Sequence, residues 1–398
     1  MANSILTPTA VTREALRILH QKLNFVGNIV REYDDSFAKK GARIGDTLKI
    51  RLPNQYSVRT GATLTTQDTN ETSVSLTVGT QKGVDLNFTS VDLTLSLDDF
   101  SDRILQPAMT VLAANIEADS LSMYKDVANS VWNGGSAATL AKVLQGRKLL
   151  QDHLAPLNDR TALLNTQDNV DIVTDVKGLF NAQDTISKQY KEGYVGRTAG
   201  FDFAENTLIP AHLRGAGNTA YTTNTTGLAT DGTEYAAITV ATGTGTLKKG
   251  DVITIAGIDR CHPESKADQG ALRQFVVTAD YAGGGGSVSI SPSIFLGGPK
   301  QNCVAATTST TAAVAIAGTA STAVGTSLMF QKEAFAFATA DLVMPQGVDF
   351  ASRQVLDGVS MRIVRAYDIN NDKFPCRIDV LYGYKTLRAS LACRLHNN

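Results

Sequence analysis

The stretch that decides the fold is residues 96–132, SLDDFSDRILQPAMTVLAANIEADSLSMYKDVANSVW. It is the longest segment in which apolar residues recur at spacings of three and four, the period of an amphipathic helix. The apolar stripe comprises Met109, Leu112, Ile116, Met123, Val127 and Val131, and the polar face comprises Asn115, Ser122, Lys125 and Asn129. We predict one helix from Pro107 to Trp132, about 39 Å long at ~1.5 Å per residue. Pro107 suits a first helical position, and Gly134 and Gly135 suit a helix end.

A short helix is expected just ahead of this one. Ser96 is followed three residues later by Asp99, which resembles a capping box for a lead-in helix that runs through Leu105. The stripe taken alone indicates an ordinary buried helix. What distinguishes it is that a single long helix lies in a chain otherwise made of strands and loops.

The N-terminal region has a second helical pattern, which begins at Thr12. Its apolar residues alternate spacings of three and four and are Leu16, Leu19, Leu23, Val26, Val30 and Tyr33. Fewer than three heptads are too short for a coiled coil, so we interpret the segment as an arm that packs on a neighbouring surface. Gly41 and Gly45 end it.

Two alternating segments, Asp46–Pro53 and Ser73–Val78, predict a β-hairpin, and Val84, Leu86 and Phe88 continue the strand pattern. The connection Asn54–Thr72 is long, polar and rich in Thr, Asn and Gln. A compact monomer rarely carries such a loop without a functional reason, so we expect it to lie against another molecule.

The middle and the C-terminal part of the chain mix helices with strands. The expected helices are 136–154 and 168–175, and the expected strands are 161–164, 201–209, 359–367 and 378–384, the last two joined by a turn at 368–373. Residues 215–327 differ, because they are dominated by Thr, Ser, Ala and Gly and contain only short alternating runs. They predict a separate all-β module inserted into one parent domain.

Composition excludes several classes of protein. Lys and Arg total 37 against 38 Asp and Glu, so a net charge of −1 gives no overall attraction to nucleic acid or membrane. Cys261, Cys303, Cys376 and Cys393 have no CxxC spacing, which argues against a zinc site or a disulfide framework and favours isolated reduced thiols. With no signal peptide pattern and no run of ~18 apolar residues, we expect a soluble protein made in a cytosol.

No constellation of catalytic residues is found. Walker, nucleophile-elbow and HExxH patterns are absent from the sequence. Asp368, Asn370 and Asp372 match the first ligands of a calcium loop, but Lys373 replaces the required glycine, which favours a hairpin turn. The single histidines His20, His153, His212 and His396 are expected at the surface or in packing. We therefore expect no enzyme activity, no metal and no cofactor.

Five stretches together resemble the major capsid (coat) protein of tailed bacteriophages, in the short-tailed branch whose coat carries an inserted β-barrel. They are GDTLKIRLP (Gly45–Pro53), GYVGRTAGFDFAENTLIP (Gly193–Pro210), LKKGDVITIAGI (Leu247–Ile258), MFQKEAFAFATADLVMPQG (Met329–Gly347) and RIDVLYGYKTLRASLACRL (Arg377–Leu395). None of them is specific alone. Their order and spacing over nearly the whole chain carry the resemblance.

The resemblance implies the α+β fold named after a Hong Kong phage, with a long spine helix, an extended β-hairpin loop and an inserted barrel-like domain. It assigns a role to each segment. These roles are the N-terminal arm (1–45), the extended loop (46–90), the spine-helix region of the peripheral domain (91–135), the first part of the axial domain (136–214), the inserted domain (215–327), and the remaining axial and peripheral strands (328–398).

The function implied is a subunit that self-assembles into the icosahedral shell around packaged double-stranded DNA. In this family the extended loop reaches over the adjacent subunit, so Tyr56, Arg59 and Glu71 would contact a second copy. The partners implied are hexamers and pentamers of the same chain, a portal protein, and DNA held non-specifically on the inner face, with no membrane. The location implied is the virion, after assembly in the bacterial cytoplasm.

Departures from the family pattern limit what is carried over. Because the arm starts near Thr12, with no fused scaffolding segment ahead of it, we expect a separate scaffolding protein. Residues 53–80 contain no lysine, so covalent crosslinking through the extended loop is not expected. The loop Thr222–Thr233 is short and has one charge, Asp231, which argues against bridging between capsomers. The alternatives kept open are a β-rich tail or adhesin protein and a hydrolase with an unrecognised site.

Overall fold

The structure is a computed structural model, and it describes residues 8–34, 47–59, 61–64, 66, 71–88, 104–176, 196–217, 221–348, 350–369 and 373–397. The chain forms two compact units, each assembled from separate parts of the sequence. Unit 1 comprises Met1–Arg51, Ser73–Leu121 and Phe335–Leu387. Unit 2 comprises Leu52–Thr72, Ser122–Ala334 and Arg388–Asn398.

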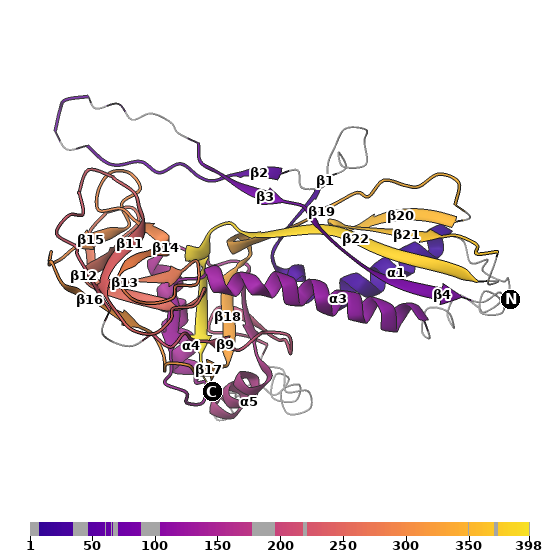
Figure 1. Ribbon diagram of the computed structural model, residues 1–398, viewed down its shortest axis with the longest axis horizontal. Helices are drawn as coiled ribbons and strands as arrows, with labels where there is room; N and C mark the ends of the chain where they lie inside the picture. Colours follow the sequence, from indigo (N-terminus) through magenta and orange to yellow (C-terminus); the bar gives the residue numbers. More distant parts are fainter. Residues whose placement is uncertain are drawn as a thin grey trace. The chain divides into compact units, whose positions relative to one another are not determined.

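Unit 1 is built on a mixed sheet (Figure 1). Its strand order is β1 (Val30–Asp34), β19 (Phe335–Ala340), β22 (Phe374–Thr386), β21 (Val359–Arg365) and β20 (Phe350–Leu356), with β4 (Thr80–Phe88) also paired to β22. The strand β22 is 13 residues long and is therefore long enough to pair with β4, β21 and β19 in turn. The two predicted C-terminal strands are confirmed as β21 and β22.

Two helices, α1 (Pro8–Lys22) and α3 (Gln106–Leu121), lie along this sheet and pack against each other (Figure 1). Apolar residues of α1 such as Leu16 and Leu19 are fully buried. The surface on which the predicted arm packs is therefore its own unit, through α3, β20 and β21. On the other helix, Asp119 accepts a hydrogen bond from Tyr382 and forms an ion pair with Lys82, which ties α3 to the sheet.

The first helix is shorter than predicted. It ends at Lys22, and Val30 and Tyr33, which were expected to continue it, belong to strand β1. The reason is a buried carboxylate on α3: Glu117 accepts hydrogen bonds from the backbone amides of Phe25 (3.0 Å) and Val26 (3.2 Å). These amides are thereby taken out of a continuing helix, and the chain turns into the sheet.

The spine helix is confirmed in its first part and wrong in its last turns. Met109, Leu112 and Ile116 are buried as predicted, but the helix ends at Leu121 and is followed by the 3-10 turn η5 (Ser122–Asp126) and the strand β5 (Ser130–Trp132). Asn129, assigned to the polar face, is buried and donates hydrogen bonds to the carbonyls of Ser390 and Ala392. The predicted lead-in helix from Ser96 lies almost entirely outside the described residues.

Sheet pairing replaces the helical hydrogen bonds in this region. Strand β5 runs parallel to β23 (Ala392–His396), and the Arg394 amide donates to the Asn129 carbonyl at 2.8 Å. Gly134 and Gly135 do adopt the left-handed conformation, but in the turn after β5 and not at a helix end. Met123, Val127 and Val131 are all buried, so the apolar pattern is satisfied by either conformation.

The predicted hairpin is confirmed as β2 (Thr47–Arg51) and β3 (Ser73–Thr77), paired antiparallel in unit 1. Leu76 and Val78 are fully buried against Ala336, Ala338 and Leu381 of the sheet. The backbones approach so closely that a Cβ on Gly383 would overlap the Thr77 carbonyl oxygen. The stem of the extended loop is thus anchored firmly in unit 1.

Unit 2 contains a second sheet, ordered β5, β23, β18 (Thr326–Gln331), β6 (Arg160–Leu164), β8 (Phe201–Glu205) and β7 (Arg197–Thr198). Every residue of β18 and β6 is buried, so these strands form its centre. The helices α4 (Leu140–Asp152) and α5 (Thr166–Val176) correspond to the two that were predicted here, with shifted ends.

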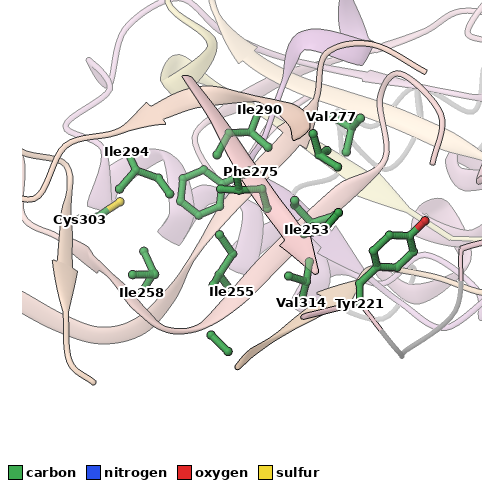
Figure 2. Close-up of a cluster of buried hydrophobic side chains, with 14 of the residues drawn as sticks. Tyr221, Ile253, Ile255, Ile258, Phe275, Val277, Ile290, Ile294, Cys303 and Val314 are labelled. Atoms are coloured by element: carbon green, nitrogen blue, oxygen red, sulfur yellow. The ribbon is translucent and has the colours of Figure 1, made fainter. Parts of the chain in front are cut away.

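The inserted module of unit 2 is all-β, as its composition predicted, and it forms a β-barrel, as the resemblance implied. Its strands are β10 (Thr222–Thr223), β11 (Tyr235–Thr242), β12 (Val252–Cys261), β13 (Asp268–Val277), β14 (Gly286–Ile294), β15 (Cys303–Ala305) and β16 (Ala312–Ile316). The sheet closes because β12 pairs with both β16 and β13. Figure 2 shows the side chains that converge inside it, among them Phe275, Ile253 and Ile290.

The barrel is joined to the rest of unit 2 by two short strands. The chain leads into it through β9 (His212–Leu213) and leaves through β17 (Ala323–Val324), and these two pair antiparallel. Both ends of the insertion therefore meet at one place, as expected for a module inserted into a single parent domain.

Candidate inter-subunit loop and barrel junction

The loop between β2 and β3 exposes apolar side chains. Its base is closed by a hydrogen bond from the Leu52 amide to the Thr72 carbonyl at 2.8 Å. Beyond that bond, Tyr56 is 56% exposed, Leu64 is 78% exposed and Val58 is 93% exposed. Large apolar side chains gathered on one exposed segment are typical of a surface that binds another protein.

The three residues predicted to contact a second copy all lie on or beside this loop. Tyr56 and Glu71 are exposed. The Arg59 guanidinium folds back on its own loop, donating hydrogen bonds to the carbonyl of Gly61 and to that of Thr63. Their contact with a second copy stays a prediction. Sequence reasoning missed Val58 and Leu64, although isolated apolar residues in a polar loop were a usable signal.

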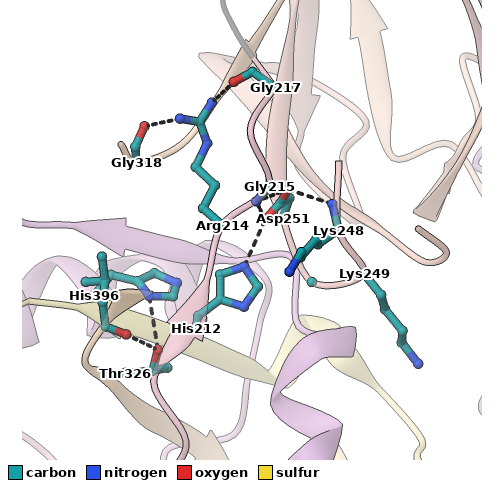
Figure 3. Close-up of polar contacts among 12 residues, drawn as sticks. His212, Arg214, Gly215, Gly217, Lys248, Lys249, Asp251, Gly318, Thr326 and His396 are labelled. Carbon is teal, nitrogen blue, oxygen red and sulfur yellow. Dashed lines mark hydrogen bonds and ion pairs between the residues drawn. The ribbon is translucent and has the colours of Figure 1, made fainter. Parts of the chain in front are cut away.

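A buried polar cluster, the barrel junction, holds the base of the barrel in unit 2 (Figure 3). His212 Nε2 lies 3.0 Å from the Asp251 carboxylate, which also accepts the backbone amides of Gly215 (3.1 Å) and Lys248 (2.9 Å). Because Asp251 is fully buried with three donors around it, this carboxylate fixes the 248–251 turn to the strand that leads into the barrel.

A second group in the same cluster ties the two ends of the insertion together. Arg214 donates to the Gly217 carbonyl and to the Gly318 carbonyl, each at 2.8 Å (Figure 3). The buried Arg394 also donates to this region, to the Gly250 carbonyl at 2.8 Å. Burial lowers the pKa of Arg394 to about 10, while Tyr124, Cys393 and the two carboxylates nearby oppose the shift.

The structure brings together two histidines that the sequence separates widely. The rings of His212 and His396 lie 6.0 Å apart, and His396 Nδ1 is 3.2 Å from the Thr326 hydroxyl. Burial lowers the pKa of His396 well below its usual value, and the positive charge of Arg394 adds to that effect. The cavity beside these rings is about 10 Å³, room for one water, so the arrangement serves packing.

Other chemistry-bearing residues are also buried or used in turns. All four cysteines are free and buried, and burial raises the pKa of Cys303, Cys376 and Cys393 to about 12, so these groups are thiols at neutral pH. The prediction of isolated thiols is confirmed. His262, next to Cys261, accepts the amides of Glu264 and Ser265.

Within the described part of the chain, no group of three or more His, Cys, Asp or Glu is placed to hold a metal ion. In the rejected calcium loop, Asn370 and Asp372 lie outside the described residues, and Asp368 and Lys373 pair through their backbones as the end of a hairpin. Among the helices that the structure describes, none is long and apolar enough to cross a membrane.

Solved phage structures are similar to this chain at low sequence identity. One is "Mycobacterium phage Che8", with 11% sequence identity over 94% of this chain and 90% of that chain, and a TM-score of 0.44. Another is the bacteriophage PhiM1 mature capsid, with 10% identity over 92% of this chain and 85% of that chain, and a TM-score of 0.42. A third is the satellite phage P4 procapsid, which includes the size determination protein Sid. It has 8% sequence identity over 97% of this chain and 90% of that chain, and a TM-score of 0.41. No curated protein matches the chain.

One family model, described as "P22 coat protein - gene protein 5", matches residues 21–393, nearly all of the 398-residue chain. The class defined by this match is the phage capsid subunit with the α+β capsid fold. The chain belongs to the P22 coat protein family. It is a major capsid protein, which confirms the resemblance and the fold class, and the tail or adhesin alternative is not favoured.

Proposed function

We propose that copies of this chain close into an icosahedral shell of hexamers and pentamers around packaged DNA, with the loop Leu52–Thr72 clasping the adjacent subunit. The observation that supports the clasp is the exposure of Tyr56, Val58 and Leu64 on that loop. Complete burial of an aliphatic side chain such as Val58 or Leu64 stabilises an interface by about 1.5–3 kcal/mol. Since every subunit donates and receives one loop, this contribution repeats around the shell.

The folded state of the loop also favours docking. Arg59 is already held by carbonyls of its own loop, so less conformational freedom is lost when the loop meets a neighbour. Tyr56 supplies an aromatic anchor of the kind that dominates binding energy at protein interfaces. Glu71 adds a carboxylate at the other end of the loop, where its charge would help to set the register against the neighbour.

The remaining partners belong to the same proposal and rest on family membership. They are a separate scaffolding protein, a portal protein, and DNA contacted without sequence preference on the inner face. Assembly would take place in the bacterial cytoplasm, and the product would be the virion capsid. A shell subunit acts through binding alone, so we assign it no catalytic reaction.

The experiment compares aspartate substitutions on and off the loop. Val58→Asp and Leu64→Asp should leave the melting temperature of the subunit nearly unchanged, because both side chains are solvent-exposed. Shells seen by electron microscopy and sedimentation should be lost, because the charge would be buried at the clasp. Val170→Asp on α5, where the side chain is 59% exposed, is the matched control and should assemble normally.

Normal shells from both loop variants would contradict the proposal. So would an equal loss of shells in the Val170→Asp control, because the loop would then have no special role.

A further inference from the structure

Unit 2 contains a cavity that the shell function does not use. It measures about 330 Å³ and lies between strand β5, helix α4 with the residue that follows it, and strands β12 and β13 of the barrel. We call it the α4–β13 cavity. A volume above ~300 Å³ is in the range of small-molecule sites. The walls are held firmly, because the Gln274 amide group accepts the Ser130 N–H and donates to the Ser130 carbonyl, each at 2.8 Å.

The cavity carries an excess of positive charge. Lys148, Arg260 and Arg273 line it, against a single carboxylate, Asp152. That carboxylate forms an ion pair with Arg260, with 2.7 Å between Arg260 Nη2 and Asp152 Oδ2, and Arg260 also donates a hydrogen bond to the Gln269 side chain. Lys148 is solvent-exposed at the rim, and the net charge of the lining is positive even with His153 neutral.

Arg273 is a buried cation of the lining whose side chain the fold leaves partly unsatisfied. Its side chain is 93% buried, since the residue is only 7% exposed, yet no described carboxylate pairs with it and its Nε has no acceptor. Ser130, which also lines the cavity, is 5% exposed, and its buried hydroxyl likewise has no partner among the described residues. A buried guanidinium without a carboxylate partner costs several kcal/mol, and an anion bound in the cavity would offset that cost.

His153 completes the lining. It is buried at the end of α4, and burial is the largest of the causes that lower its pKa well below 6.5, followed by the charges of Arg273 and Arg260. An anion placed between these groups would offset the two positive charges and allow the imidazole to take a proton.

We propose that the α4–β13 cavity binds a tetrahedral oxyanion of the phosphate class, either free phosphate or a small phosphate monoester. The planar guanidinium of Arg273 can donate two parallel hydrogen bonds to such an oxyanion, and Lys148 supplies a point charge from the rim. The cavity is larger than phosphate alone needs, which leaves room for a small organic group. The site lies within unit 2 and is independent of the extended loop.

The only tryptophan of the chain, Trp132, lines this cavity and provides the readout. Inorganic phosphate is titrated into the full-length subunit, against chloride and acetate at matched ionic strength, while tryptophan fluorescence is recorded. We expect a saturable change with phosphate only. Arg273→Met should weaken binding at least about tenfold, since a hydrogen bond to a charged group is lost.

Two further variants keep the test decisive. Lys148→Met should weaken phosphate binding severalfold, and because Lys148 is exposed this variant will fold even if Arg273→Met does not. Lys300→Met removes an exposed barrel charge outside the cavity and should bind phosphate like the wild type. The proposal is overturned by the absence of a saturable change, by unaltered binding in Arg273→Met or Lys148→Met, or by an equal response to acetate.

Discussion

Mild acid should destabilise unit 2 through two histidines that are buried in the neutral form. Burial is the largest of the causes that lower the pKa values of His153 and His396 well below 6.5. Arg273 and Arg260 beside His153, and Arg394 and His212 beside His396, act in the same direction. In the unfolded chain both imidazoles have ordinary pKa values. Below pH 6.5 the unfolded state therefore binds more protons than the folded state. As a result, the free energy of unfolding falls as the pH falls.

The size of the effect follows from the number of groups. Each such imidazole lowers the free energy of unfolding by up to ~1.4 kcal/mol per pH unit, from its unfolded pKa down to its folded pKa. Between pH 6.5 and pH 5 the two together therefore remove at most about 4 kcal/mol. That is a large part of the ~5–15 kcal/mol that stabilises an ordinary domain. The loss is complete only below both folded pKa values.

The assay is urea unfolding of the full-length subunit at pH 7, 6 and 5 in phosphate-free buffer, followed by Trp132 fluorescence. In His396→Gln, the free energy of unfolding should lose about half of its dependence on pH. Comparing this variant with the wild type isolates the imidazole from Asp168. Burial raises the pKa of Asp168, so that group makes the folded state more stable as the pH falls. A free energy of unfolding that stays constant from pH 7 to pH 5, or a full slope in His396→Gln, would refute this reasoning.

Three further predictions concern packing and folding. Phe275→Ala, in the centre of the barrel, should lower the free energy of unfolding by about 3–5 kcal/mol in urea titrations, and a loss below ~1 kcal/mol would show that the site repacks. Gly383→Val should lower the melting temperature of the subunit, because its side chain would meet the Thr77 carbonyl, and Gly27→Ala, where a Cβ has no neighbour within 4 Å, should change it far less. Residues 215–327 expressed alone should give well-dispersed amide signals by NMR, because the barrel is closed and has its own core, and poor dispersion would count against an independent module.

Local patterns predicted the strands well and the end of the spine helix poorly. Alternation in segments such as 238–240 reports one buried face, and that face is inside the barrel. Burial of Met123, Val127 and Val131 does not separate a helix from a turn followed by a strand. The choice between a helix and a strand is made by partners far away in the sequence. One of them is Gln274, 144 residues further along, which accepts a hydrogen bond from the Ser130 amide. No local pattern contains that information.

The candidate sites divide in the same way. The extended loop could be predicted because a long polar connection within a hairpin is itself a local feature, and Tyr56, Arg59 and Glu71 do lie there. The barrel junction and the α4–β13 cavity could not, since they join groups such as His212 and His396, or His153 and Arg273, from distant segments. Single charged residues in separate strands give no signal until the fold brings them together.

Cryo-electron microscopy of the particles that this chain forms when expressed with the proposed scaffolding protein shows directly whether the loop reaches the adjacent copy. We expect closed icosahedral shells in which Leu52–Thr72 of each subunit rests on the adjacent copy, with Val58 and Leu64 buried at that contact. Rings or open tubes would contradict the shell, and closed shells that leave Val58 and Leu64 in solvent would contradict the clasp.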